Sequence, residues 1–133
     1  MRLQQALGTG ATAIICAALL VTACRESIGP ANTGQLTVDV SAAAAPGAAF
    51  QVMVIGEGIT DPVVANAGDL LYSFASNDTV RVAVIGEHSS GPLFRFTVPD
   101  GRPASSYAVV LLEVAGNDNA LLSETDFTLT ARN

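Results

Sequence analysis

A chain of 133 residues is long enough for one domain and too short for two, since an independent domain needs on the order of 100 residues to bury a sufficient core. Half of the residues are hydrophobic and 14% are charged, which excludes a disordered chain. The formal charge of -6 and the absence of lysine give an acidic surface that repels phosphate backbones, so nucleic acid is a poor partner.

The first 23 residues have the layout of an export signal. Arg2 is the one early positive charge, and no further charge occurs before Arg25. The densest apolar run, residues 11–23, would span about 20 Å as a helix, short of the roughly 30 Å hydrocarbon core of a bilayer. This favours a signal-peptide helix, with a retained helix or ordinary signal cleavage as the alternatives.

The signal ends in the four residues VTAC, 21–24, which resemble the lipobox of bacterial lipoproteins. In that family the peptide is cut before the cysteine, here between Ala23 and Cys24, and the sulfur carries a diacylglyceryl group. Several acyl chains at about 0.8 kcal/mol per buried methylene make such an anchor practically permanent. The resemblance implies that Cys24 bears palmitate-type lipid and that the membrane is a partner. Arg25 stands where retained inner-membrane lipoproteins carry aspartate, which implies the outer membrane of the cell envelope.

A polar spacer broken by Gly29, Pro30 and Gly34 follows the cysteine and predicts a flexible tether. The chain is therefore divided into a signal peptide (1–23), a lipidated cysteine with its tether (24–34) and a folded domain (35–133). Cys16 leaves with the signal peptide, so the mature protein would have no thiol free for a disulfide or a metal. No cofactor is expected.

Beyond residue 35 apolar residues recur with a period of two, which is typical of half-buried strands. The predicted strands are 35–41, 48–56, 69–76, 79–86, 93–99, 107–116 and 126–131. The side chains expected to face inward are Leu36, Val38, Val40, Phe50, Val52, Val54, Val80, Val82, Val84, Phe94, Phe96, Val98, Phe127 and Leu129.

Three further features complete the predicted organisation. The turn at residues 76–78 predicts a hairpin, and the run 107–116, apolar on both faces, predicts a central strand buried on both sides. The segment 42–47 and the stretch containing Gly58 and Pro62 are predicted loops. Seven or eight short strands without an amphipathic helix predict an all-β antiparallel sandwich, with a closed barrel as the alternative.

The segment TVRVAVIGEHSSGPLFRFTVP, residues 79–99, resembles the strand, loop and strand unit of cohesin-like domains, and residues 106–122 are similar to their late strand and polar loop. This resemblance implies an immunoglobulin-like sandwich that serves protein association or carbohydrate-related adhesion. The segment 49–65 lacks the aromatic-Asp pattern usual in cohesins, so no dockerin-contacting residue can be transferred to this chain.

Catalytic residues are not predicted. His88 is the one histidine, and it stands beside Glu87, Ser89 and Ser90. Neighbours in one loop rarely point at each other, and the G-x-S-x-G nucleophile elbow does not occur, so a solvated loop is the expected state. A hydrolase is the weakest functional alternative.

Calcium and a glycan are the two candidate ligands. Asn117, Asp118 and Asn119 bring oxygen atoms together, which makes them weak calcium candidates, but their spacing differs from an EF-hand loop and a turn is expected. Tryptophan is absent, and the tyrosines Tyr72 and Tyr107 lie in predicted strands. Core packing is therefore expected for both tyrosines and for Phe74, which shares a face with Tyr72. A small aromatic patch formed by Tyr72 and Phe74 is the alternative.

The sequence thus predicts a lipid-anchored, non-catalytic sandwich of the cell envelope that associates with an unidentified envelope protein. An accessory domain for glycan or calcium is the alternative. The competing functions make different structural predictions. An exposed Tyr72 would favour ligand stacking, a long uncovered edge strand would favour association, and an enclosed pocket around His88 and Glu87 would favour catalysis.

Overall fold

The computed structural model describes residues 33–133. The predicted signal-peptide helix, its cleavage site at Ala23 and Cys24, and the tether up to residue 32 lie outside the described residues. Within the described part, no helix is long and apolar enough to cross a membrane.

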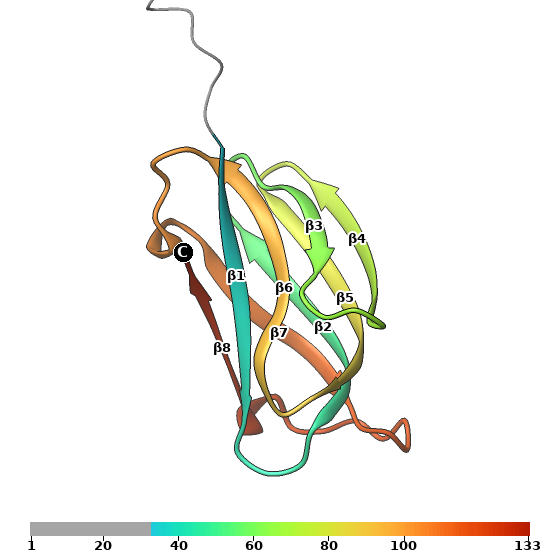
Figure 1. The fold of residues 1–133 in the computed structure, drawn as a ribbon. Helices are drawn as coiled ribbons and strands as arrows, with labels where there is room; N and C mark the ends of the chain where they lie inside the picture. Colours follow the sequence, from blue (N-terminus) through green and yellow to red (C-terminus); the bar gives the residue numbers. More distant parts are fainter. Residues whose placement is uncertain (1–32) are drawn as a thin grey trace, which may run out of the picture. The chain divides into compact units, whose positions relative to one another are not determined.

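The described residues form eight strands in two four-stranded sheets (Figure 1). The strands are β1 (Thr33–Ala42), β2 (Gly47–Ile55), β3 (Thr60–Val64), β4 (Leu70–Ser76), β5 (Thr79–His88), β6 (Ser90–Pro99), β7 (Ala108–Ala115) and β8 (Phe127–Arg132). Two single-turn 3-10 helices, Ala104–Ser106 and Glu124–Asp126, precede β7 and β8. The sheet orders are β3-β6-β1-β8 and β4-β5-β2-β7, and all pairs are antiparallel.

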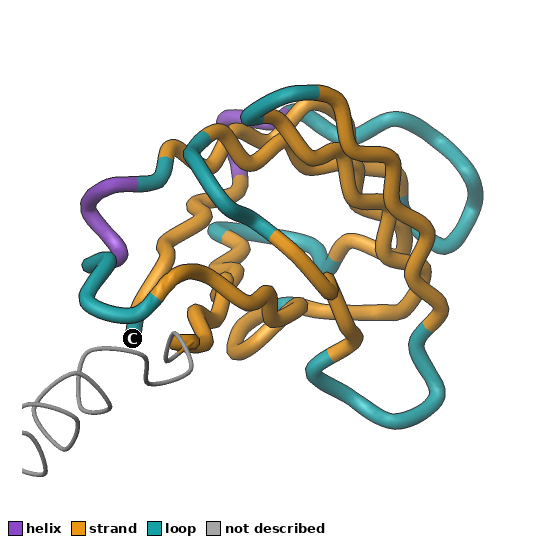
Figure 2. The backbone as a smooth tube through the Cα atoms, turned by 90° about the horizontal axis from the view of Figure 1, so that it is seen from above, coloured by secondary structure: helices purple, strands orange, loops and turns teal. Residues whose placement is uncertain are grey.

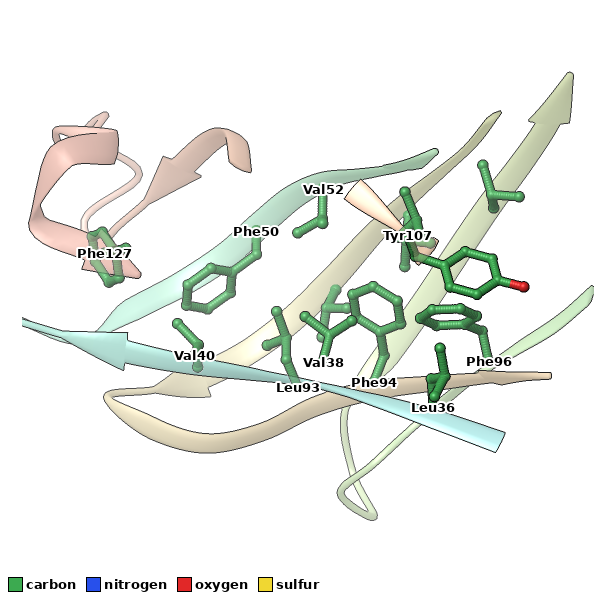
Figure 3. Close-up of a cluster of buried hydrophobic side chains, with 14 of the residues drawn as sticks. Leu36, Val38, Val40, Phe50, Val52, Leu93, Phe94, Phe96, Tyr107 and Phe127 are labelled. Carbon is green, nitrogen blue, oxygen red and sulfur yellow. The ribbon is translucent and has the colours of Figure 1, made fainter. Parts of the chain in front are cut away.

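The prediction of an antiparallel β-sandwich is confirmed. Strand and loop alternate around two stacked layers, as the view from above shows (Figure 2). The apolar side chains at every second position of the strands fill the space between the layers. Leu36, Val38 and Val40 of β1 are 2%, 0% and 2% exposed. The predicted inward residues of β2, β5 and β6 are buried in the same way, and several of them are drawn in Figure 3.

The predicted hairpin is formed by β4 and β5. Its turn consists of Asn77 and Asp78 alone, and Ser76 pairs with Thr79 across it. Asn77 has a φ of 53°, the left-handed conformation that two-residue hairpin turns require and that asparagine tolerates.

The predicted loop around Pro62 is wrong in part, because residues 60–64 form the short strand β3. This strand lies at the edge of its sheet and pairs with β6 alone. An edge strand can carry a proline because one side of it has no ladder partner for an N–H group.

The predicted central position of the 107–116 segment is also wrong. Its strand, β7, is the outermost strand of its sheet and pairs with β2. Val109, Leu111 and Val114 contact the core, whereas Val110 is 39% exposed. The apolar residues on the other face of β7 therefore belong to the molecular surface.

Candidate functional site

The outward side of the β4-β5-β2-β7 sheet is almost uncharged, and we call it the apolar face. Register pairs place its side chains in four cross-strand rows. In strand order these rows are Leu70–Ile85–Ala49–Ala115, Tyr72–Ala83–Gln51–Glu113, Phe74–Arg81–Met53–Val110 and Ser76–Thr79–Ile55–Ala108. Arg81 and Glu113 are the charged residues among these sixteen positions.

Large hydrophobic side chains on this face are exposed. Tyr72 and Phe74 are 65% and 69% exposed, and Leu70 is 54% exposed. Ile85, Ile55 and Val110 expose between 39% and 44% of their surface. Contiguous exposed apolar residues on a soluble domain mark a surface that another molecule covers.

The outward side of the other sheet provides an internal comparison. It carries Thr97, Thr128 and Thr130, and Arg132 of β8 donates to the carboxylate of Asp39 on β1 at 2.5 Å. Val63 is the one large hydrophobic residue of this sheet that is exposed among residues 33–133. Because one sheet has an ordinary polar exterior, the apolar face is a property of the other sheet and not of the whole sandwich.

The apolar face is hollowed in three places. One hollow of about 290 Å³ lies between Ala49, Ile85 and Leu121. The second, of about 370 Å³, lies between Tyr72, Phe74 and Gln51, and the third, of about 430 Å³, adjoins Met53 and Arg81. All three open directly to solvent on this face, so a partner can contact them without a conformational change.

The expectation that Tyr72 and Phe74 belong to the core is wrong. Ser76 faces Thr79 across a two-residue turn, and the ladder continues without a register shift, so Tyr72 faces Ala83 and Phe74 faces Arg81. Because the alternating residues Val80, Val82 and Val84 point inward, these aromatic side chains point outward.

Tyr107, in contrast, is a core residue as expected. It is 7% exposed, and its ring packs edge-on against Phe96 with centroids 5.6 Å apart (Figure 3). Its hydroxyl donates to the carbonyl oxygen of Glu57 at 2.9 Å. This bond connects the start of β7 to the loop after β2.

The expectation of a solvated loop around His88 is wrong as well. His88 ends β5, and its Nε2 atom donates to Oδ2 of Asp69 at 2.6 Å. The two side chains are 10% and 11% exposed. Gly86 makes room for this pair, because a Cβ atom there would meet the Asp69 carboxylate. Nothing local in the sequence indicates the pair, since its members are 19 residues apart.

The other polar candidates occupy separate positions. Glu87 accepts a hydrogen bond from the Asn117 side chain and does not join His88. Asp118 accepts from the Ala120 N–H at 3.1 Å, and Asn119 has a φ of 61°, so these residues build a turn. Among residues 33–133, no group of three histidine, cysteine or acidic side chains is placed to hold a metal ion.

Comparisons with known proteins give one informative result. No protein-family model matches the chain, and no curated protein matches its sequence. Among solved structures, the chain is similar to a non-cellulosomal cohesin from the hyperthermophilic archaeon Archaeoglobus fulgidus, with a TM-score of 0.53 and 15% identity. The similarity covers 70% of this chain and 74% of that protein. The fold of the described residues is therefore a cohesin-like β-sandwich.

Proposed function

We propose that this protein is a non-catalytic association module whose apolar face docks onto a protein of the cell envelope. The observation that carries the proposal is the contrast between the two sheets. One exterior is polar, whereas the other exposes Tyr72, Phe74 and Leu70 and has two charged residues among its sixteen cross-strand positions. The centre of a protein interface is typically apolar, rich in aromatic residues and depleted in charge.

The comparison with a cohesin supports the fold on which this proposal rests. The polar groups described above support the non-catalytic part. His88 is held by Asp69 and Glu87 by Asn117, so neither is arranged around a nucleophile. Nucleophilic catalysis needs a nucleophile within hydrogen-bond reach of its base.

A second candidate is a ligand-stacking site, and the exposure of Tyr72 favours it. Tyr72 and Phe74 lie two residues apart on the same side of β4, with Arg81 and Gln51 nearby. A sugar ring can stack on aromatic faces, but its hydroxyl groups need several polar partners. The polar side chains here are few compared with the apolar ones, which favours a protein partner.

A photo-crosslinking amino acid at Ala83, in the middle of the apolar face, tests the docking proposal. The matched control carries the same group at Thr130, on the polar exterior of the other sheet. In intact envelopes we expect one defined heavier adduct from position 83 and none from position 130. Equal labelling from both positions, or no adduct from 83, would contradict docking through this face.

A second measurement places the crosslinking amino acid at Met53, on the same face. The adduct that forms from position 53 in the otherwise unchanged chain should be lost in the Ala83→Glu variant. A carboxylate at the centre of an apolar interface loses its hydration when the partner docks, which is costly. The expected result is at least a tenfold lower adduct yield with an unchanged far-UV circular dichroism spectrum. Addition of soluble glycans should leave the yield unchanged, whereas competition by a glycan would favour the stacking site.

We also propose that lipid on Cys24 anchors the protein to the outer membrane. The support is the VTAC sequence and the spacer that follows it. Cys24→Ala should abolish metabolic labelling with radioactive palmitate and release the protein from sedimented membranes, while Cys16→Ala, the control, should change neither. Retained label in Cys24→Ala would refute the anchor and leave the docking proposal untouched.

A further inference from the structure

The free edge of β4 differs from the other three sheet edges of the sandwich. An exposed edge strand is a template for pairing with another chain, and proteins usually protect it with charges, proline, bulges or a covering segment. β4 has none of these within its sequence LLYSFAS, and its pairing with β5 has no register shift. Six of its seven residues are exposed.

Each of the other three edges carries at least one of these protective features. β3 is five residues long, contains Asp61 and Pro62, and has an irregular register with β6. β8 ends in Arg132, which is paired with Asp39. The edge of β7 is covered at its end, where the Leu122 N–H donates to the carbonyl oxygen of Val114 at 2.9 Å and Leu121 bridges to Ala115.

The hairpin register shows which backbone groups of β4 are free. Ser76 and Thr79 close a two-residue turn and therefore exchange both backbone hydrogen bonds. In an antiparallel ladder every second residue exchanges both bonds with the partner strand. The backbone N–H and C=O groups of Leu71, Ser73 and Ala75 therefore point away from β5, toward the free edge. β3 belongs to the other sheet, and among residues 33–133 no backbone group of another segment bonds these three residues.

We propose that a second copy of this chain pairs with β4, antiparallel and across a two-fold axis at Ser73. In this register Ser73 faces its own counterpart, and Leu71 faces Ala75 of the second copy. The free backbone groups of these residues then satisfy one another. The β4-β5-β2-β7 sheet of one copy and the same sheet of the other copy then form one sheet of eight strands with a continuous apolar face.

Side chains on β4 match this arrangement. Tyr72 of each copy lies opposite Phe74 of the other in a non-hydrogen-bonded pair, where cross-strand side chains approach most closely. Both rings are exposed in the single chain, at 65% and 69%. Each copy therefore supplies the aromatic side chain that the other lacks across its edge.

The absence of charge on β4 favours a second copy, and the exposed aromatic area predicts how strongly that copy binds. The whole chain carries a formal charge of -6, yet β4 contains no charged residue, so no like charges meet along the paired strands. At about 200 Å² per aromatic side chain, the exposed parts of Tyr72 and Phe74 amount to roughly 550 Å² in two copies. Stable interfaces bury about 1,200 Å² or more. The expected dimer is therefore weak and depends on protein concentration.

Disulfide formation in the full-length chain tests the register. Cα atoms of a hydrogen-bonded antiparallel pair are about 5.5 Å apart, within the range of a disulfide. Ser73→Cys should therefore form a covalent dimer under mild oxidation. Ala75→Cys is the matched control, because about 14 Å would separate this residue from its counterpart. Both variants retain the same native cysteines, so that background is equal.

The expected result is at least a tenfold higher dimer yield for Ser73→Cys than for Ala75→Cys on a non-reducing gel. An equal mixture of Tyr72→Cys and Phe74→Cys chains should also crosslink, and each variant by itself should do so much less. Equal yields at positions 73 and 75, or no dimer from either Ser73→Cys or the mixture, would overturn the proposal.

This inference does not depend on the envelope partner or on the lipid. Ala83→Glu, one strand away from the edge, should leave the Ser73→Cys dimer intact. Conversely, Ser73→Pro removes an N–H group on the free side of β4 and should abolish the dimer, while the adduct from the crosslinker at Ala83 persists. Failure of one proposal is therefore distinguishable from failure of the other.

Discussion

The hydrogen bond between His88 and Asp69 is predicted to stabilise the fold, and a double-mutant cycle measures its contribution. The Nε2 and Oδ2 atoms lie 2.6 Å apart, and both side chains are nearly buried, at 10% and 11% exposure. The bond connects the end of β5 to the residue just before β4. Removal of one partner leaves the other buried without a hydrogen bond.

The expected magnitude follows from this burial. A hydrogen bond to a charged group contributes about 1.5–3 kcal/mol, and an unpaired buried group carries a comparable penalty. His88→Ala and Asp69→Ala should therefore each lower the free energy of unfolding by about 2 kcal/mol or more. His88→Ala should have the larger effect, because its ring also packs against Phe50 with centroids 6.2 Å apart. The double variant should lose about 2 kcal/mol less unfolding free energy than the sum of the losses in the two single variants.

Chemical denaturation of the full chain in a mild detergent, followed by far-UV circular dichroism, measures the four free energies. The matched control is the ion pair of Arg102 with Glu57, in which the side chains are 42% and 67% exposed. Its coupling energy should not exceed about 0.5 kcal/mol, because solvent screens an exposed pair. A coupling energy for His88 and Asp69 as small as that of the control would refute the reasoning.

Two further predictions concern single substitutions, with stability measured in the same way. Tyr107→Phe removes the bond to the Glu57 carbonyl and keeps the ring, so it should cost about 1 kcal/mol, and no loss of stability would contradict this assignment. Gly86→Ala places a methyl group against the Asp69 carboxylate, so it should be destabilising. The control is Gly101→Ser. Gly101 has a φ of 76°, and a Cβ atom there would have no neighbour within 4 Å, so this variant should cost only backbone strain. Equal destabilisation by the two glycine variants would show that the contact with Asp69 is unimportant.

Much of the core was predictable, because the alternation of residues is a local signal. Val80, Val82 and Val84 are apolar at every second position, and a strand with this pattern can bury only one of its faces against the other sheet. The same holds for Phe94 and Phe96. The turn at Asn77 and Asp78 was visible for a similar reason, since those residue types favour its backbone conformation.

The position of a strand within its sheet was not predictable. The segment 107–116 is apolar on both sides, which is typical of a central strand, but the topology places β7 at an edge. Tyr72 and Phe74 belong to the same class of error. A hydrophobic residue on a strand is expected to face the core, and only the register with β5 shows that these two face outward.

The site was therefore the part that the sequence described least well. An apolar face and a hydrophobic core have the same composition, so the sequence does not distinguish the residues of the face from those of the core. The pair of Asp69 and His88 depends on a contact across 19 residues that no local pattern records. In contrast, the sandwich class required only the count and the period of the strands.

The pairing of β1 with both β6 and β8 has a consequence for biogenesis. β1 is an inner strand of its sheet, and one of its neighbours comprises residues 127–132. A chain that emerges during its synthesis with the amino end first cannot complete this sheet until about 90 further residues have followed β1. Until then the valines of β1 lack one hydrogen-bonded neighbour strand, and long-range strand pairing is slow. Completion of this sheet is therefore a late event, and the emerging chain needs protection from aggregation until its last strand is released.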